Sequence, residues 1–144
     1  MKPSDYPYAP LVPELICSDF ARSREFYVGL LGFRPAYERP EHRFAYLERG
    51  PVQIMIEQYS EDGSWLTGEM VQPYGRGINL QIEIGDLDAL AAKIKLAGIP
   101  FYKAPVDRWY RVDDHESGQR QFLVQDPDGY LLRFCQNIGE RPVT

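Results

Sequence analysis

The sequence has few of the features that mark several large classes of protein. Its 144 residues include only two cysteines, Cys17 and Cys135, which cannot make the disulfide framework of a small secreted protein. We therefore expect a reducing, cytoplasmic environment. No apolar run approaches the roughly 18 residues of a transmembrane helix. Positive charge is scarce too, because 16 lysines and arginines face 21 aspartates and glutamates, a net charge of −5. An acidic chain repels phosphate, so nucleic acid is not an expected partner. Because the chain has no transmembrane run, a membrane is not an expected partner either.

Catalytic signatures are also missing from the sequence. It has no G-x-S-x-G nucleophile elbow, no P-loop and no Cys–His pair at a recognisable spacing. The two histidines, His42 and His115, fall in expected loops. The acidic run from Asp113 to Glu116 is typical of a solvated charge run and less so of a cation site. The sequence therefore predicts no catalytic residues.

The chain does contain a core-forming composition and an internal repeat. Apolar residues make up 44% of the chain and aromatic residues 13%, which suits one folded domain of this length. An extended run, an aspartate, a helical apolar pattern and a glycine occur in this order twice. Asp19 and Asp86 occupy the expected N-cap positions, and Gly32 and Gly98 end the two helices.

Each expected helix is followed by segments with the alternation and turns of β-strands. Strands are expected at residues 11–17, 34–38, 44–48 and 52–59 in the first half, and at 78–84, 101–103, 122–125 and 130–136 in the second. Residues 105–118 are interpreted as a long loop, and residues 1–8 and 139–144 as tails. The pattern is βαβββ twice within one domain, residues 1–144, with module one at about 9–60, a connector at 61–76 and module two at about 77–138.

Two motifs resemble the vicinal oxygen chelate superfamily, which contains glyoxalase I, extradiol dioxygenases, fosfomycin-resistance enzymes and bleomycin-resistance proteins. They are Phe26-Tyr27-Val28-Gly29-Leu30-Leu31-Gly32-Phe33 after Ser18-Asp19, and the closing Asp126-Pro127-Asp128-Gly129-Tyr130-Leu131-Leu132-Arg133-Phe134. The resemblance implies an α+β fold of two tandem βαβββ modules forming curved mixed sheets around a concave cavity. Within the superfamily, Val12-Pro13 and the last strand with Gln136-Asn137 most resemble bleomycin-resistance proteins.

Strand alternation assigns side chains to the face that would line this cavity. Leu80, Ile82 and Ile84 fall on one face of their strand and are expected under a helix. The opposite faces of the strands are polar and carry Glu14, Gln53, Glu57, Asn79, Gln81, Glu83 and Arg133. A simply solvated sheet face is the alternative to a pocket. The fold that the resemblance implies favours the pocket.

The resemblance also raises the question of a metal, because enzymes of the superfamily hold a divalent cation through His, Glu or Gln on four inner strands. Projecting that pattern onto this chain gives Val12, Met55, Asn79 and Arg133. Valine cannot ligate a metal, a thioether is too soft for Mg²⁺, Mn²⁺ or Zn²⁺, and arginine is a permanent cation. We therefore expect no metal and no other cofactor.

Aromatic side chains outside the expected core indicate the kind of ligand. Aromatic planes beside carboxylates suit a flat cation, through stacking and cation–π attraction. The residues expected to bind it are Phe44, Tyr46, Gln53, Glu57, Tyr59, Trp65, Asn79, Gln81, Trp109 and Arg133. For Trp65 and Trp109 the alternative is that they pin loops onto the body of the protein.

The resemblance thus implies a metal-free small-molecule-binding protein and not an enzyme. It would be a homodimer that sequesters a cationic, aromatic antibiotic of the bleomycin type in a dimer groove. Arg133 is either neutralised among the carboxylates or binds an anionic ligand instead. A metal-dependent lyase or dioxygenase of the same superfamily is the rival hypothesis, and a dimeric protein without a small ligand is a third.

Overall fold

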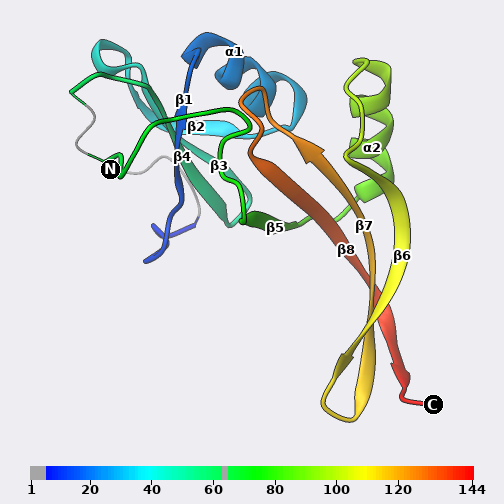
Figure 1. Ribbon diagram of the computed structural model, residues 1–144. Helices are drawn as coiled ribbons and strands as arrows, with labels where there is room; N and C mark the ends of the chain where they lie inside the picture. The colour runs from blue at the N-terminus through cyan, green and yellow to red at the C-terminus, as the bar shows by residue number, and fades with distance from the viewer. Residues whose placement is uncertain (1–5, 63–64) are drawn as a thin grey trace. The chain divides into compact units, whose positions relative to one another are not determined.

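Residues 6–62 and 65–144 are described in a computed structural model (Figure 1). The chain divides into two units, Met1–Tyr74 and Gly75–Thr144, each with a four-stranded mixed sheet. The protein is therefore α+β, with two tandem modules, as the repeat predicts. Residues 1–5 of the expected N-terminal tail and residues 63–64 of the expected connector lie outside the described residues.

The first unit follows the predicted order of elements. Its strands are β1 (Glu14–Cys17), β2 (Arg34–Arg39), β3 (Phe44–Arg49) and β4 (Val52–Gln58), and its helices are α1 (Phe20–Arg24), a π-helix (Glu25–Leu30) and a 3₁₀ turn (Pro40–His42). The strands lie in the order β1-β4-β3-β2. β1 runs parallel to β4 and the other neighbours are antiparallel, which makes the sheet mixed.

The second unit repeats this arrangement. Its elements are β5 (Asn79–Glu83), α2 (Leu87–Leu96), β6 (Lys103–Val112), β7 (His115–Gln125) and β8 (Leu131–Pro142). The strand order β5-β8-β7-β6 matches that of the first sheet position for position. As in the first unit, the first strand runs parallel to the last, and the other described neighbours are antiparallel. The internal repeat seen in the sequence is thus a repeat of topology.

The two helices begin and end where the sequence predicts. The Asp19 carboxylate accepts the backbone N–H of Arg22 at 3.2 Å, and the Asp86 carboxylate accepts that of Ala89 at 3.0 Å. Each bond satisfies one of the orphan donors of a helix N-terminus. Gly32 and Gly98 follow the helices with φ of +82° and +76°, a left-handed conformation that glycine adopts without strain.

Each sheet buries one face beneath its own helix, as strand alternation predicts. In the first unit the core includes Leu15, Cys17, Tyr27, Leu31, Phe33, Leu47, Ile54 and Ile56. In the second it includes Ile82, Ile84, Leu87, Leu90, Ile94, Phe122, Val124, Leu132 and Phe134. Both cysteine side chains are buried, as expected for small hydrophobic residues, and the Cys17 thiol donates to the backbone carbonyl of Glu57 at 3.2 Å. Within residues 6–62 and 65–144, no helix has the length and apolar character needed to cross a bilayer.

Two expectations about loops and tails are wrong. Residues 105–118, expected to form a loop, belong to the β6–β7 hairpin, and His115 opens β7. Residues 139–142, expected in a tail, continue β8 and pair with β7 as far as His115 opposite Pro142. Both segments are rich in charged residues, which are more typical of loops and tails than of strands. In the hairpin these charges pair across strands, with Arg120 bound to Asp107 at 2.9 Å and Arg141 to Glu116 at 2.9 Å.

Candidate functional site

The expected binding residues divide between the two units. The first unit contains Phe44, Tyr46, Gln53, Glu57, Tyr59 and Trp65, and the second contains Asn79, Gln81, Trp109 and Arg133. The first provides an acidic pocket with an exposed indole, and the second a polar sheet face with unpaired cations.

The aromatic residues of β3 are core residues of the first unit. Phe44 and Tyr46 are only 2% and 5% exposed, and with Ala36 they form a cluster against which Val12 and Met55 pack. The Tyr37 ring stacks on Tyr46 with centroids 5.2 Å apart. The expectation that a core has little use for Phe44 and Tyr46 is therefore wrong. Their strand packs side chains on both faces, and a sequence reading of one strand does not reveal the second packed face.

Gln53 on β4 is buried and holds the N-terminal segment. Its side-chain carbonyl accepts the backbone N–H of Ala9 at 2.8 Å, and its amide nitrogen donates to the carbonyl of Pro7 at 2.8 Å. The Tyr46 hydroxyl donates to the same side-chain carbonyl. The Gln53 amide thus pairs with the N-terminal backbone much as a neighbouring strand would. Its hydrogen-bonding capacity is used inside the first unit.

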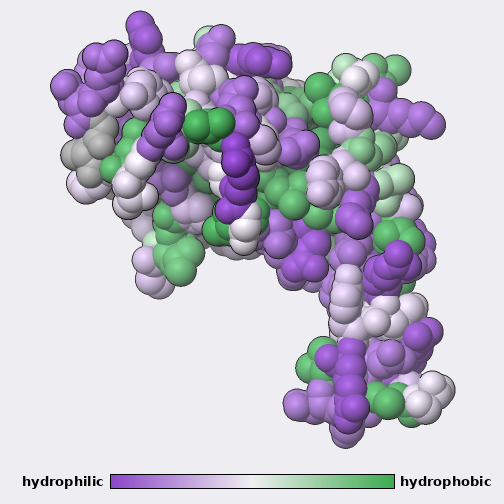
Figure 2. All heavy atoms as spheres, viewed as in Figure 1, coloured by the Kyte–Doolittle hydropathy of each residue, from purple (hydrophilic) through white to green (hydrophobic). Residues whose placement is uncertain are grey.

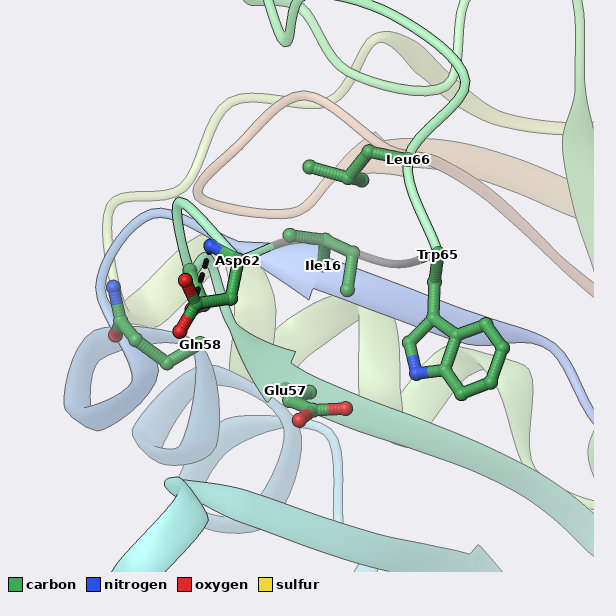
Figure 3. Close-up of a pocket in the computed structure, with 7 residues that line it drawn as sticks. Ile16, Glu57, Gln58, Asp62, Trp65 and Leu66 are labelled. Atoms are coloured by element: carbon green, nitrogen blue, oxygen red, sulfur yellow. Dashed lines mark hydrogen bonds between the residues drawn. The ribbon is translucent and has the colours of Figure 1, made fainter.

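Glu57 and Trp65 share a pocket at the end of β4. The pocket has a volume of about 140 Å³ and is lined by Ile16, Glu57, Gln58, Ser60, Asp62, Trp65 and Leu66. Figure 3 shows the Glu57 carboxylate and the Trp65 ring on the same side of β4. The Trp65 side chain is 74% exposed, so its indole face is free to stack. Tyr59, which follows β4 and is also exposed, does not line this pocket.

Gln58, which also lines the pocket, is held in place by two hydrogen bonds of its side chain. Its side-chain carbonyl accepts the N–H of Phe20 at 2.7 Å and its amide donates to the carbonyl of Ser18 at 2.7 Å. These bonds join the end of β4 to the start of α1. The position of the neighbouring Glu57 is fixed by the same strand, because Glu57 pairs with Ile16 of β1 and Phe44 of β3.

A second carboxyl group lies beside Glu57. Burial raises the pKa of Glu14. The charge of Glu57 and a hydrogen bond between the two carboxyl groups raise this pKa further, and the charge of Arg39 has a smaller, lowering effect on it. The two side chains project from the neighbouring strands β1 and β4, two positions apart in register. A cation near this pair would be favoured, because it offsets the repulsion between the two carboxylates.

The second unit presents a polar sheet face opposite α2. Two adjoining hollows lie on it, with volumes of about 340 and 310 Å³, and both include Gln121 and Arg133. The first is also lined by Asn79, Lys103, Ala104, Val106, Arg108 and Leu123, and the second by Gln81, Tyr110, Val112, Ser117, Gln119 and Cys135. The alternation that assigned Asn79, Gln81 and Arg133 to one face thus extends across all four strands.

Arg133 lies at the centre of this face. One of its terminal nitrogens donates to the side-chain carbonyl of Gln81 at 2.6 Å. Its Nε is buried and has no hydrogen-bond partner among the described residues. Beside it, burial raises the pKa of the Cys135 thiol, with a further rise from Glu83 and a smaller opposing effect from Arg133. The thiol therefore stays protonated near neutral pH.

Trp109 lies on the opposite face of the second sheet. It pairs with Gly118, where a side-chain Cβ would come within 2.8 Å of both the indole and Ile138. The Arg141 guanidinium lies 4.2 Å from the centre of the Trp109 ring. Tyr110, the next residue on β6, points to the other face and lines the hollow, because successive side chains of a strand alternate between its faces. Trp109 is therefore a packing residue of the β6–β8 strands, separated from Arg133 by the thickness of the sheet.

The four positions projected for a metal do not form a donor set that fits one. Val12 and Met55 pack against the Ala36–Phe44–Tyr46 cluster of the first unit. Asn79 lines a hollow in the second unit together with Arg133, whose guanidinium would repel a cation. Among the described residues, no three His, Cys, Asp or Glu side chains are grouped so that they could hold a metal ion.

Several pocket residues were not among those expected from the sequence. They are Ile16, Asp62 and Leu66 in the first unit, and Lys103, Arg108, Tyr110 and Gln121 in the second. Val106, Arg108, Tyr110 and Val112 alternate with Asp107, Trp109 and Arg111 in the manner of a strand. That alternation is the signal that could have placed Arg108 and Tyr110 on the face with Arg133.

The fold and its repeat define a class of protein: a chain of two tandem βαβββ modules, each with a mixed sheet in the same strand order. The model of the Glyoxalase/Bleomycin resistance protein/Dioxygenase superfamily matches residues 10–134, nearly the whole of this chain. The protein therefore belongs to that superfamily, and the resemblance found in the two sequence motifs is confirmed at this level.

Solved structures of the same class span most of the chain. It is 37% identical to a glyoxalase/bleomycin resistance protein/dioxygenase superfamily member from Vibrio splendidus 12B01, over 88% of this chain and 97% of that one, with a TM-score of 0.41. A glyoxalase/bleomycin resistance protein/dioxygenase from Alicyclobacillus acidocaldarius is 25% identical, over 90% and 93%, with a TM-score of 0.60. TioX from Micromonospora sp. ML1 is 23% identical, over 91% and 100%, with a TM-score of 0.69. No curated protein matches the sequence significantly.

Proposed function

We propose that this protein binds a cationic, aromatic small molecule and sequesters it without a chemical step, in the manner of the bleomycin-resistance proteins of its superfamily. The observation that carries the proposal is the pocket shared by the Glu57 carboxylate and the exposed Trp65 indole. A carboxylate supplies charge and an aromatic face supplies stacking and cation–π attraction. At about 140 Å³ the pocket takes one ring or one cationic group of a larger ligand, since pockets for whole drug-sized molecules span roughly 300–1,000 Å³.

A sequestering function needs no metal, and the donor set at the projected positions supports that part of the proposal. Valine and methionine in a packed cluster, and an arginine, provide no cage for a divalent ion. Metal analysis of the purified protein separates the two classes of function. A stoichiometric transition metal that is lost on Glu57→Gln substitution would favour a metal-dependent lyase or dioxygenase and overturn this proposal.

Replacing Glu57 by glutamine is expected to weaken bleomycin binding at least about tenfold, because it removes one of the two carboxylates that line the pocket, the other being Asp62, and keeps the pocket's shape. Trp65→Phe should abolish most of the fluorescence quenching, since Trp65 is the tryptophan that lines this pocket. Binding should also weaken as the pH falls through the raised pKa of Glu14, because protonation removes half of the carboxylate pair. Tryptophan-fluorescence titration with bleomycin, checked by calorimetry, measures all three effects.

Glu41→Gln is the matched control for this titration. Glu41 is an exposed carboxylate of the first unit that does not line the pocket, so its loss changes the net charge equally. Equal weakening by the two glutamine variants would show that only the overall charge matters. If micromolar bleomycin neither quenches the fluorescence nor releases heat, the antibiotic is not the ligand.

The proposal includes a second copy of the chain. The outer parts of β6, β7 and β8 extend beyond α2 and β5, and carry hydrophilic side chains with a few hydrophobic ones among them (Figures 1 and 2). β6 is an edge strand, and β8 beyond Cys135 pairs only with β7 within the described part of the chain. Unpaired strand edges are templates for pairing with another chain. Tyr110 and Val112 are exposed hydrophobic residues of this edge.

Sedimentation velocity at micromolar protein should therefore give a particle of twice the 16.6 kDa chain mass. An edge contact between strands is made by main-chain hydrogen bonds, so the dimer should persist at high salt. A single species at the chain mass across the concentration range would contradict the dimer and leave the ligand proposal to be judged by the titration.

A further inference from the structure

The polar face of the second sheet has an excess of positive charge that the Glu57 pocket lacks. Lys103, Arg108 and Arg133 all line one hollow of about 340 Å³. Among the described residues, no aspartate or glutamate lines this hollow or the adjoining one. None of the three cations is ion-paired to a described residue. The nearby carboxylate is that of Glu83 at the end of β5, whose charge is felt by Cys135 in the adjoining hollow.

This arrangement concentrates positive charge in a chain of net charge −5, whereas four other arginines are neutralised by ion pairs. Arg24, Arg34, Arg120 and Arg141 each lie within 3.3 Å of a carboxylate oxygen. Three unpaired cations converging on one concave surface raise the local potential and favour an anion there.

Arg133 is held in a position from which it can bind an anion. Its bond to Gln81 fixes one terminal nitrogen, and Gln81 lies directly opposite Arg133 in the parallel β5–β8 register. The buried Nε finds no acceptor in the described part of the chain. A guanidinium with free donors and a fixed plane matches the two oxygens of a carboxylate.

The adjoining hollow of about 310 Å³ is suited to an uncharged, flat part of the same ligand. Tyr110, Val112 and Cys135 line it, and the Tyr110 hydroxyl accepts a hydrogen bond from Gln121 at 2.8 Å. Gln121 and Arg133 belong to both hollows, so a molecule held by its acidic group at Arg133 extends naturally toward Tyr110.

We propose that this face of the second unit is a binding site for a small aromatic acid, with the anionic group on Arg133, Lys103 and Arg108 and the ring beside Tyr110. The site is separate in chemistry from the cation-binding pocket proposed for Glu57.

Calorimetric titration with 2-naphthoate tests the proposal, with 2-naphthamide as the neutral molecule of the same shape. We expect 2-naphthoate to bind at least about tenfold more tightly than the amide, and binding to weaken with added salt. Naphthyl phosphate distinguishes the two kinds of anionic group. Tighter binding of naphthyl phosphate would identify a phosphate ester as the natural class of ligand. Tighter binding of 2-naphthoate would identify a carboxylic acid as that class.

Arg133→Gln and Arg108→Gln should each weaken 2-naphthoate binding at least about tenfold, and Arg133→Lys should recover only part of the loss. The matched control is Arg111→Gln. Arg111 lies on the same strand as Arg108 and its Nε donates to the backbone of Asp113, but it does not line either hollow. Because Arg108 is exposed, its variant remains informative even if Arg133→Gln fails to fold.

Equal binding of 2-naphthoate and 2-naphthamide would overturn the proposal, as would an equal loss in Arg108→Gln and Arg111→Gln. The Glu57→Gln variant should bind 2-naphthoate as well as the natural chain does. The two proposals can therefore be tested independently. Bleomycin binding should depend on Glu57 and not on Arg108, whereas 2-naphthoate binding should depend on Arg108 and not on Glu57.

Discussion

Alanine in place of Phe134 is expected to lower the free energy of unfolding by about 3–5 kcal/mol, a large part of the stability of a domain of this size. The Phe134 side chain is fully buried in the second unit. Its ring stacks on Phe122 with centroids 5.4 Å apart, and Phe122 in turn meets the edge of Phe101 at 5.2 Å. Removing the ring leaves a cavity that a paired β8 strand cannot collapse to fill.

The measurement is urea denaturation in a Trp65→Phe background, where Trp109 alone reports on the second unit. Leu96→Ala is the control, because Leu96 is a hydrophobic residue of α2 that is 90% exposed and its truncation should change stability by less than about 0.5 kcal/mol. Similar losses for the two variants would mean that the Phe101–Phe122–Phe134 stack is not the core of this unit. The result also bears on function, because Phe134 anchors the strand that carries Arg133.

Alanine in place of Asp126 is expected to cost about 2–4 kcal/mol, the second largest effect that we predict. Asp126 is buried, and one oxygen of its carboxylate accepts the backbone N–H groups of Asp128 at 2.9 Å and Tyr130 at 3.0 Å. Its backbone carbonyl also accepts the N–H of Gly129 at 3.0 Å, which closes the turn. Without the carboxylate, one buried and one partly buried backbone donor before β8 lose their acceptor.

Asp126→Asn separates the hydrogen bonds from the charge. Asparagine keeps one carbonyl oxygen as an acceptor, so it should restore more than half of the stability lost with alanine in the same denaturation experiment. If the asparagine variant is as unstable as the alanine variant, the charge matters and the acceptor geometry does not. This turn is the one that the sequence predicted from Asp126-Pro127-Asp128-Gly129, and the structure adds the reason for its aspartate.

Strand alternation allowed part of the candidate site to be predicted from the sequence. Asn79, Gln81 and Arg133 were assigned to one face because Leu80, Ile82 and Phe134 demand the other, and the hollows of the second unit contain all three polar residues. Glu57 was assigned in the same way against Ile54 and Ile56. These assignments depend only on the period of two that a strand imposes, which is a local property.

The same rule could not tell which polar or aromatic residues are already engaged. Gln53 and Glu57 share one face of β4, yet Gln53 binds the backbone of residues 7 and 9 whereas Glu57 lines a pocket. Phe44 and Tyr46 pack with Val12 and Met55, which come from other strands. Partners more than forty residues away in the chain hold Gln53, and other strands supply the neighbours of Phe44 and Tyr46, so no pattern within one strand contains these roles.

The sequence by itself determined the two modules, the caps of both helices, the buried face of each sheet and the superfamily, because each depends on local propensity, period or motif. Only the tertiary structure decided how residues 105–118 pair with neighbouring strands and how their charges are satisfied, for example by the ion pair of Asp107 with Arg120 across β6 and β7. It alone also brought Lys103 and Arg108 to the face of Arg133, because the pairing of β6, β7 and β8 joins residues that lie far apart in the chain.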